Sequence, residues 1–242
     1  MERTFDPNGE ARPSWRVGDS VCTCADLIEC VDTVGFLPMF ESGIEGFSAD
    51  AFAADECRYQ VRPDGSWVWP LWRWKGPVVT DGGCVYGKFF AGKAGFVSRR
   101  WWPDFCNWRR HSRPLPPVDT EAGMVMDTVL QVLRGSGSMV SRDLRKACGL
   151  TGPRMRSVFD RQVALMQMGC RIVTEDFVYP RDRHGHEYGW GLSLLTTPER
   201  LLGTDAEHCD LTPEESLSRM AEHLRGLLPG AKESQIMREF GI

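Results

Sequence analysis

The stretch TGPRMRSVFDRQVALMQMGCRIVTEDFVYP, residues 151–180, predicts a helix that runs directly into a strand. Thr151 or Gly152 is suited to cap the helix, and Pro153 is favoured in a first turn. One face carries Met155, Val158, Phe159, Gln162, Leu165 and Met166 at helical spacing, which indicates an amphipathic helix over 151–168. The β-branched and aromatic residues of 170–180 favour a strand.

Two further helices are predicted before this one, over 121–135 and 141–149. Turn-forming residues follow the strand at 181–187, and a return strand is predicted over 188–195. Three helices followed by a hairpin are the order of a winged helix-turn-helix, which we expect to span 119–200.

The segment RPLPPVD (113–119) contains three prolines and predicts a domain boundary. We expect a mixed, tryptophan-rich α+β unit over 21–118 before it, and an acidic helical tail over 201–242 after the winged helix. Residues 1–20 are expected to form a flexible arm. The predicted fold class of the whole chain is α+β.

Within the first unit, the pattern predicts a helix over 23–35, closed by Gly35, and a β-hairpin formed by 85–90 and 95–98. A helix or helical turn is expected over 99–111. The alternating aromatic residues of SWVWPLWRW (66–74) favour a strand with an edge or bulge at Pro70. In the tail, the pattern predicts a capped helix over 211–228 that packs on the body.

The net charge of −4 hides an uneven distribution along the chain. Residues 1–60 hold 4 basic and 12 acidic residues, 61–198 hold 20 and 12, and 199–242 hold 5 and 9. A basic centre between acidic ends indicates a body that binds a polyanion. We expect double-stranded DNA as the partner, and a homodimer is an open alternative.

Nine cysteines are scattered along the chain without a C-x-x-C pair. This pattern is typical of a reduced cytoplasmic protein, and the isolated pair Cys22 and Cys24 is too sparse for a zinc site. We therefore expect no metal and no cofactor. The sequence has no apolar secretory segment and no run of about 18 apolar residues, so we expect no membrane association.

Arginines on a recognition helix can bind guanine or phosphate in the major groove. The DNA-binding candidates of the predicted winged helix lie on the second and third helices and on the hairpin tip. They are Arg142, Arg145, Lys146, Arg154, Arg156, Arg161, Arg183 and His184. The alternative for each residue is a solvated surface charge.

Seven of the nine tryptophans lie between Trp67 and Trp108, among basic residues. Such rings can stack on unpaired bases, whereas the alternative is that they form the core. The candidates for an exposed stacking surface are Trp101, Trp102 and Trp108, beside the candidate DNA-binding residues Arg99, Arg100, Arg109 and Arg110.

Several longer motifs lie between residues 25 and 203: VGFLPMF (34–40), YGKFF (86–90), KAGFVS (93–98), Asn107 to Arg110, YGW (188–190) and TTPE (196–199). With Gln167-Met168-Gly169 at the helix-to-strand junction, they resemble the AlkZ/YcaQ family of bacterial winged-helix DNA glycosylases and their shorter AlkZ-related relatives. The resemblance implies a protein that binds or acts on alkylated or cross-linked DNA.

That family carries Gln-hydrophobic-Asp/Gln at the junction, where the second polar residue helps to position water. Gln167 is then a catalytic candidate, but Gly169 stands where the second polar residue is expected. A hydrolytic role would need another carboxylate, for which Asp176 or Glu175 is the candidate. The alternative is that Gln167 caps the helix end.

Three classes of function therefore remain open from the sequence. The protein is a lesion-binding or base-excising repair protein, a non-enzymatic winged-helix transcriptional regulator, or an interaction protein. Classical nucleophilic or metal catalysis has no motif to support it.

Overall fold

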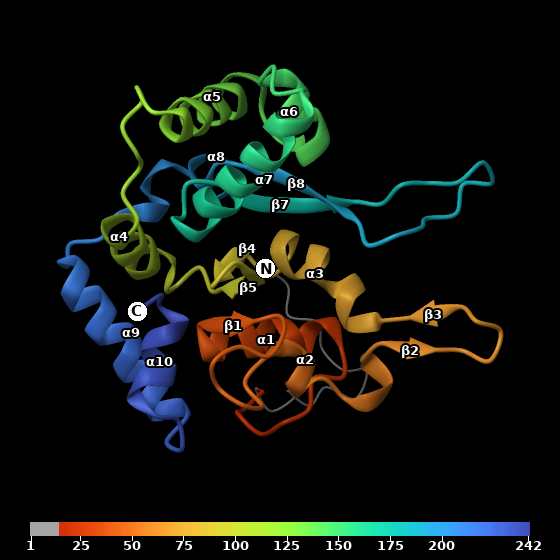
Figure 1. Cartoon of the computed structure of the whole chain (residues 1–242). Helices are drawn as coiled ribbons and strands as arrows, with labels where there is room; N and C mark the ends of the chain where they lie inside the picture. The colour runs from red at the N-terminus through yellow and green to blue at the C-terminus, as the bar shows by residue number, and fades with distance from the viewer. Residues whose placement is uncertain (1–14) are drawn as a thin grey trace.

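The computed structural model describes residues 15–242, which form a mixed α+β fold around a six-stranded antiparallel sheet (Figure 1). The predicted fold class, α+β, is therefore confirmed. The strands follow the order β1-β5-β4-β7-β8-β6, and a separate hairpin, β2–β3, projects from the body. The strands are β1 (Phe36–Pro38), β2 (Gln60–Val61), β3 (Trp67–Val68), β4 (Val85–Phe90), β5 (Lys93–Val97), β6 (Met139–Val140), β7 (Val173–Val178) and β8 (Leu192–Thr196).

Helices lie on both sides of this sheet and at its ends (Figure 1). They are α1 (Cys24–Val34), α2 (Ala49–Phe52), α3 (Pro70–Thr80), α4 (Trp102–Ser112), α5 (Glu121–Ser136), α6 (Ser141–Ala147), α7 (Pro153–Met168), α8 (Pro198–Leu202), α9 (Pro213–Leu227) and α10 (Glu233–Glu239). Two short 3-10 helices are η1 (Asp55–Cys57) and η2 (Thr204–Glu207).

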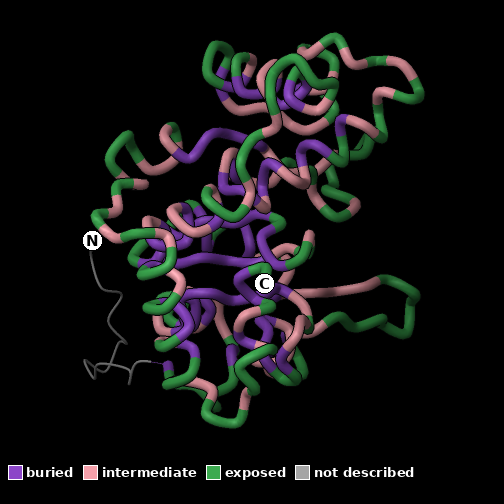
Figure 2. Tube along the Cα trace, turned by 60° about the vertical axis from the view of Figure 1, so that its left-hand side comes forward, coloured by how far each residue is buried: buried purple, intermediate pink, exposed green. Residues whose placement is uncertain are grey.

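The sheet joins strands from distant parts of the chain. Strands β1, β5 and β4 come from the first half, whereas β7, β8 and β6 come from the second. Tyr86 of β4 pairs with Thr174 of β7, and both residues are buried. Buried residues run through the middle of the molecule, whereas the projecting hairpin is partly or fully exposed (Figure 2).

The N-terminal helix and the central hairpin form as the sequence predicts. Thr23 and Asp26 make a reciprocal capping box at the start of α1. Gly35 ends the helix with φ +82°, and a Cβ there would lie 2.5 Å from Trp101. Both the backbone angle and the close ring require glycine at this position. Strands β4 and β5 then pair around Ala91 and Gly92.

The prediction of a strand over 66–74 is wrong beyond its first residues. Strand β3 covers only Trp67–Val68, and Pro70 opens the helix α3 instead of forming a bulge. Proline suits a first helical turn because its φ is already helical and its missing N–H would have no partner there. The buried residues Leu71, Lys75, Val78 and Val79 recur at helical spacing, which the alternating aromatic residues conceal.

After the proline-rich segment, the three predicted helices and the predicted hairpin are present. Helices α5, α6 and α7 surround a second apolar cluster that includes Val129, Leu133, Leu144 and Phe159. Strands β7 and β8 pair from Val173↔Thr196 to Val178↔Leu192. The loop between them, 179–191, projects on the same side of the molecule as β2–β3 (Figure 1).

The C-terminal helices are part of the main core, as expected for a tail that packs on the body. Helix α9 begins with the capping box of Thr212 and Glu215 and packs against α4. Its buried residues Met220 and Leu224 join the same apolar cluster as Phe240 and the sheet. The tail therefore covers α4.

The predicted flexible arm, 1–20, is described only from residue 15, and residues 1–14 lie outside the described residues. The prediction is wrong for Trp15, whose ring is buried and whose backbone N–H donates to Glu29 at 2.9 Å. Between residues 15 and 242, none of the helices has the length and apolar composition needed to cross a bilayer.

Candidate functional site

Gln167 lies in the last turn of α7 and is only 5% exposed. Its Oε1 accepts a hydrogen bond from the backbone N–H of Lys88 on β4 at 3.0 Å. Backbone groups close the helix end, because Cys170 N–H donates to the Gln167 carbonyl and Arg171 N–H donates to Met166. The capping interpretation is therefore wrong: the side chain joins α7 to the central sheet.

Gly169, two residues after Gln167, has a φ of −92°, which any residue adopts. A Cβ at this position would lie 3.4 Å from the Leu165 carbonyl oxygen and 3.6 Å from that of Arg113. These are ordinary contact distances, so the backbone would accept a side chain there. Glycine at 169 is therefore not imposed by the backbone, and it leaves the junction without a second polar side chain.

Asp176 lies on β7 and faces a different element from Gln167. Its Oδ1 accepts from the Phe177 N–H at 2.7 Å, and a Cβ at Gly76 of α3 would lie 3.0 Å from the same oxygen. Gln167 instead contacts β4, and no hydrogen bond joins the two side chains within residues 15–242. The structure does not bring the two catalytic candidates into direct contact.

Most of the cationic candidates on α6 and α7 are solvent-exposed. Arg142 pairs with Asp143, Arg154 pairs with Glu121 at 3.0 Å, and Arg156 lies 3.9 Å from Asp160. Arg145 donates to the Leu150 carbonyl and is half-buried. Lys146 and Arg161 are exposed and make no ion pair within the described residues. These helices therefore present exposed cations whose ion pairs are weak.

The prediction that Arg109 contacts DNA is wrong, because its guanidinium is fully buried. The Nη2 group donates to the carbonyls of Phe89 at 2.5 Å and Glu239 at 3.2 Å, and burial lowers the pKa of Arg109 to about 10. Arg110 is engaged in an ion pair with Glu207 and donates to the Cys170 carbonyl.

Two tryptophans expected at the surface are also buried. Trp101 and Trp102 pack in the main core, and Trp108 is half-buried with its Nε1 donating to the Phe240 carbonyl. Of the basic residues beside them, Arg99 and Arg100 are exposed. Arg99 donates to the Leu202 carbonyl at 3.2 Å, and Arg100 lies over the Trp101 ring.

The loop 179–191 carries the remaining candidates, Arg183 and His184, at its exposed tip. Asp182 shapes the tip, because its Oδ1 accepts from the backbone N–H groups of His184 and His186. Glu187 pairs with Arg181 on the same loop and with Arg73 of α3. The loop is thus held to α3 while its tip extends into solvent.

Five aromatic residues join this loop to the β2–β3 hairpin. Trp67 stacks on Trp190 with 4.8 Å between ring centroids, and Trp69 stacks on Trp72 at 5.0 Å. Tyr59 packs against Trp67 at 6.1 Å. We call these residues the aromatic cluster. Trp190 is 51% exposed and Tyr59 is similarly open, so the cluster offers ring surface to solvent.

Lys75 lies beneath this cluster and is fully buried. Its Nζ donates to the Trp190 carbonyl at 2.8 Å and lies 3.3 Å from the centroid of the Trp72 ring and 4.2 Å from that of Phe177. Burial, assisted by nearby Arg73, lowers the pKa of Lys75 to about 7. Ring faces favour the ammonium form and oppose this shift.

Sequence patterns did not identify the aromatic cluster as a unit or Lys75 as its support. The rings come from 59, 67–72 and 190, and only the pairing of two distant loops brings them together. The one signal in the sequence was Lys75, which lies on the apolar stripe of α3. The interpretation of 66–74 as a strand concealed this position.

The described features define a mixed α+β protein with an exposed cationic helix pair and an aromatic cluster between two projecting loops. The chain belongs to the AlkZ-related family, whose family model matches residues 21–241. Among solved structures, it is similar to the Streptomyces sahachiroi DNA glycosylase AlkZ, at 12% identity and a TM-score of 0.46. That match covers 92% of this chain and 60% of the AlkZ chain. No curated protein sequence matches this chain.

Proposed function

We propose that the protein binds duplex DNA through a winged helix-turn-helix formed by residues 119–200, and that it recognises alkylated or cross-linked DNA. The main support is the exposure of Arg154 and Arg156 on α7, whose side chains are 80% and 74% exposed. Strand β6 pairs with β8 and extends the β7–β8 hairpin into a three-stranded unit, as in winged helices.

The arginines of α7 can exchange their present partners for phosphates. Glu121 and Asp160 are themselves more than half exposed, and exposed ion pairs contribute little to stability. When an arginine binds a phosphate, counterions are released from the duplex, and this release drives association. These contacts would position the protein on DNA without reading a lesion.

The aromatic cluster supports recognition of damaged sites. Bases whose pairing is disturbed leave the stack at lower cost, and exposed rings can stack on them. Trp190 presents such a ring at the base of loop 179–191, next to Trp67. Membership of the AlkZ-related family, together with the motifs shared with AlkZ-type glycosylases, supports damaged DNA as the partner.

The arrangement favours lesion binding over base excision. Gly169 offers no group that can orient water, and the Gln167 oxygen is already engaged by Lys88. Asp176 lies against α3 and its Oδ1 accepts a backbone N–H. A base excision mechanism would need a water-positioning group that these three residues do not provide together.

The test uses two fluorescent duplexes of identical sequence, one of which carries a single N7-alkylated guanine. We expect the damaged duplex to bind at least about tenfold more tightly at the same salt concentration, with the preference lost in Trp190→Ala. A third duplex with an interstrand cross-link extends the test to that lesion class.

Equal affinity for damaged and undamaged DNA would contradict lesion recognition and favour a regulator. Each duplex is also incubated with excess protein and examined for released base by chromatography. Release of the alkylated base by the wild-type protein, but not by Gln167→Ala, would show a glycosylase and overturn the binding-only role.

A further inference from the structure

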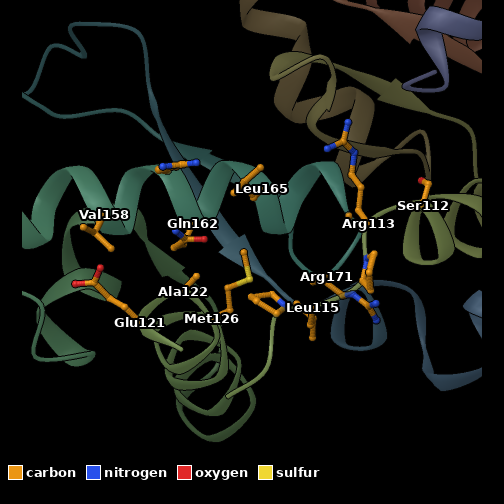
Figure 3. A pocket seen from close by; sticks show the side chains of 14 residues that line it. Ser112, Arg113, Leu115, Glu121, Ala122, Met126, Val158, Gln162, Leu165 and Arg171 are labelled. Carbon is orange, nitrogen blue, oxygen red and sulfur yellow. The ribbon is translucent and has the colours of Figure 1, made fainter. Parts of the chain in front are cut away.

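A pocket of about 660 Å³ lies between α5, α7 and the chain segment 112–116 (Figure 3). This volume falls in the range typical of small-molecule sites. Leu115, Met126, Val158 and Leu165 supply apolar wall surface. The pocket therefore suits a flat or compact apolar body. It is distinct from the aromatic cluster, whereas Arg161, an exposed arginine of α7, lies at its edge.

Gln162 projects from α7 into this pocket, in the direction of Met126 (Figure 3). The side chain is only 7% exposed, and its Oε1 is buried without a hydrogen-bond partner among the described residues. An unpaired buried acceptor is unfavourable, and most such groups in folded proteins have a partner. The unpaired oxygen is available to accept a hydrogen bond from an N–H of a bound molecule.

Arg171 lines the same pocket and lies beside Leu115 in Figure 3. Its Nε is buried, and burial and nearby Arg110 lower its pKa. Among residues 15–242, this Nε has no hydrogen-bond partner and no carboxylate forms an ion pair with the guanidinium. Glu121, the acidic residue of the lining, pairs with Arg154, and Glu207, the acidic residue that acts on Arg171 from nearby, is paired directly with Arg110.

We propose that this pocket binds a small heteroaromatic carboxylate. A flat ring system would occupy the apolar walls, a ring N–H would donate to Gln162 Oε1, and the carboxylate would accept from Arg171. Arginine and carboxylate pair strongly because the planar guanidinium can donate two parallel hydrogen bonds. This ligand site does not depend on the proposed DNA binding.

Three probes of similar size separate the two polar contacts. Indole-3-acetate carries the ring N–H and the carboxylate, naphthalene-1-acetate lacks the N–H, and indole-3-ethanol lacks the charge. Isothermal titration calorimetry on the full chain should show indole-3-acetate binding at least about tenfold more tightly than either of the others.

Two variants assign each preference to its residue. In Gln162→Leu, indole-3-acetate and naphthalene-1-acetate should bind equally well, because the acceptor is gone. This variant removes an unpaired buried polar atom, so its melting temperature should not fall. In Arg171→Gln, indole-3-acetate should bind only as well as indole-3-ethanol.

Gly169 at the pocket edge provides a matched charge test, because its backbone accepts a side chain. Gly169→Asp should abolish binding of indole-3-acetate by repulsion, whereas Gly169→Asn should retain most of it.

The proposal is overturned if none of the three probes binds at millimolar concentration, or if Gln162→Leu keeps the preference for the ring N–H. Tighter binding of adenosine 5′-monophosphate than of indole-3-acetate would also overturn it, because the ligand class would then be a nucleotide.

Discussion

The amide oxygen of Gln167 accepts a hydrogen bond from the backbone N–H of Lys88, 79 residues earlier in the chain. Lys88 lies where the pairing of β4 with β5 shifts register between Gly87 and Phe90. Such an irregularity leaves ladder groups without a strand partner. The glutamine at the end of α7 satisfies one of these groups, which explains a polar residue at an otherwise apolar junction.

Replacing Gln167 by methionine keeps the side-chain volume but leaves the Lys88 N–H without its acceptor. We expect the free energy of unfolding to fall by about 1–3 kcal/mol, as for a buried donor that loses its partner. Urea denaturation measures this change. Gln131→Met, at an exposed site on α5, is the control and should change stability by no more than about 0.5 kcal/mol.

If Gln167→Met is as stable as wild type yet fails to bind damaged DNA, the side chain is a site residue and not a structural link. Both quantities are therefore measured on the same preparation.

The arginines of α7 are expected to carry most of the DNA affinity. Changing Arg154, Arg156 and Arg161 to alanine should weaken duplex binding strongly and lower the slope of log K against log salt by about 1 for each phosphate that the variant no longer binds. The matched control changes Arg16, Arg225 and Arg238, which are exposed and lie elsewhere on the surface, and so removes the same charge. Equal losses in the two triple variants would indicate a general charge effect and contradict a contact through α7.

The sequence predicted the helices α5, α6 and α7 because their capping residues and apolar periodicity are local signals. It did not predict that Arg109, Trp101 and Trp102 are buried. Their helix, α4, is covered by α9 and α10, which follow about 100 residues later in the chain. A helix rich in basic and aromatic residues has the pattern of a surface helix until the elements that cover it are known.

The helix α3 was missed for a different reason. The aromatic residues at 67, 69, 72 and 74 alternate like those of a strand at the start, and proline is compatible both with a strand edge and with a first helical turn. Only the packing of Lys75 and Val78 against the body distinguishes the two. Prediction of the candidate site was limited by the same long-range pairing, because Trp67 and Trp190 meet only in the folded chain.

Lys75 should make stability depend on pH. Its pKa is about 7 in the folded protein and near 10.5 in the unfolded chain. Between these two pKa values the unfolded chain binds one more proton than the folded protein. The free energy of unfolding should therefore rise with pH from 7 towards 10. Below pH 7 the cost of the buried charge is fully present.

Urea denaturation at pH 6, 7, 8 and 9 compares wild type with Lys75→Met. In the variant, the contribution of Lys75 to the rise of the free energy of unfolding with pH should be absent. The variant shares every other titrating group, so the difference between the two proteins isolates Lys75. Parallel curves would mean that the ammonium is held charged by the Trp72 and Phe177 rings throughout this range.

Trp190 should hold loop 179–191 against the β2–β3 hairpin. Trp190→Ala removes the stacking with Trp67, for which aromatic pairs contribute about 0.5–1.5 kcal/mol beyond their buried area. We expect faster tryptic cleavage at Arg181 and Arg183 in this variant. Tyr188→Ala changes an exposed aromatic residue of the same loop and should leave the cleavage rate unchanged. Equal acceleration in both variants would contradict a specific role of Trp190.

The buried guanidinium of Arg109 depends on an acceptor 130 residues further along the chain, the carbonyl of Glu239. A ribosome adds about 5–20 residues per second, so this partner is made on the order of 10 s after Arg109. During that time the guanidinium of Arg109 lacks one of its two carbonyl acceptors. The aromatic rings of α4 are not yet covered by α9 and α10. Completion of the core therefore waits for the synthesis of α9 and α10, and chaperone contact with the uncovered α4 surface would fall in this interval.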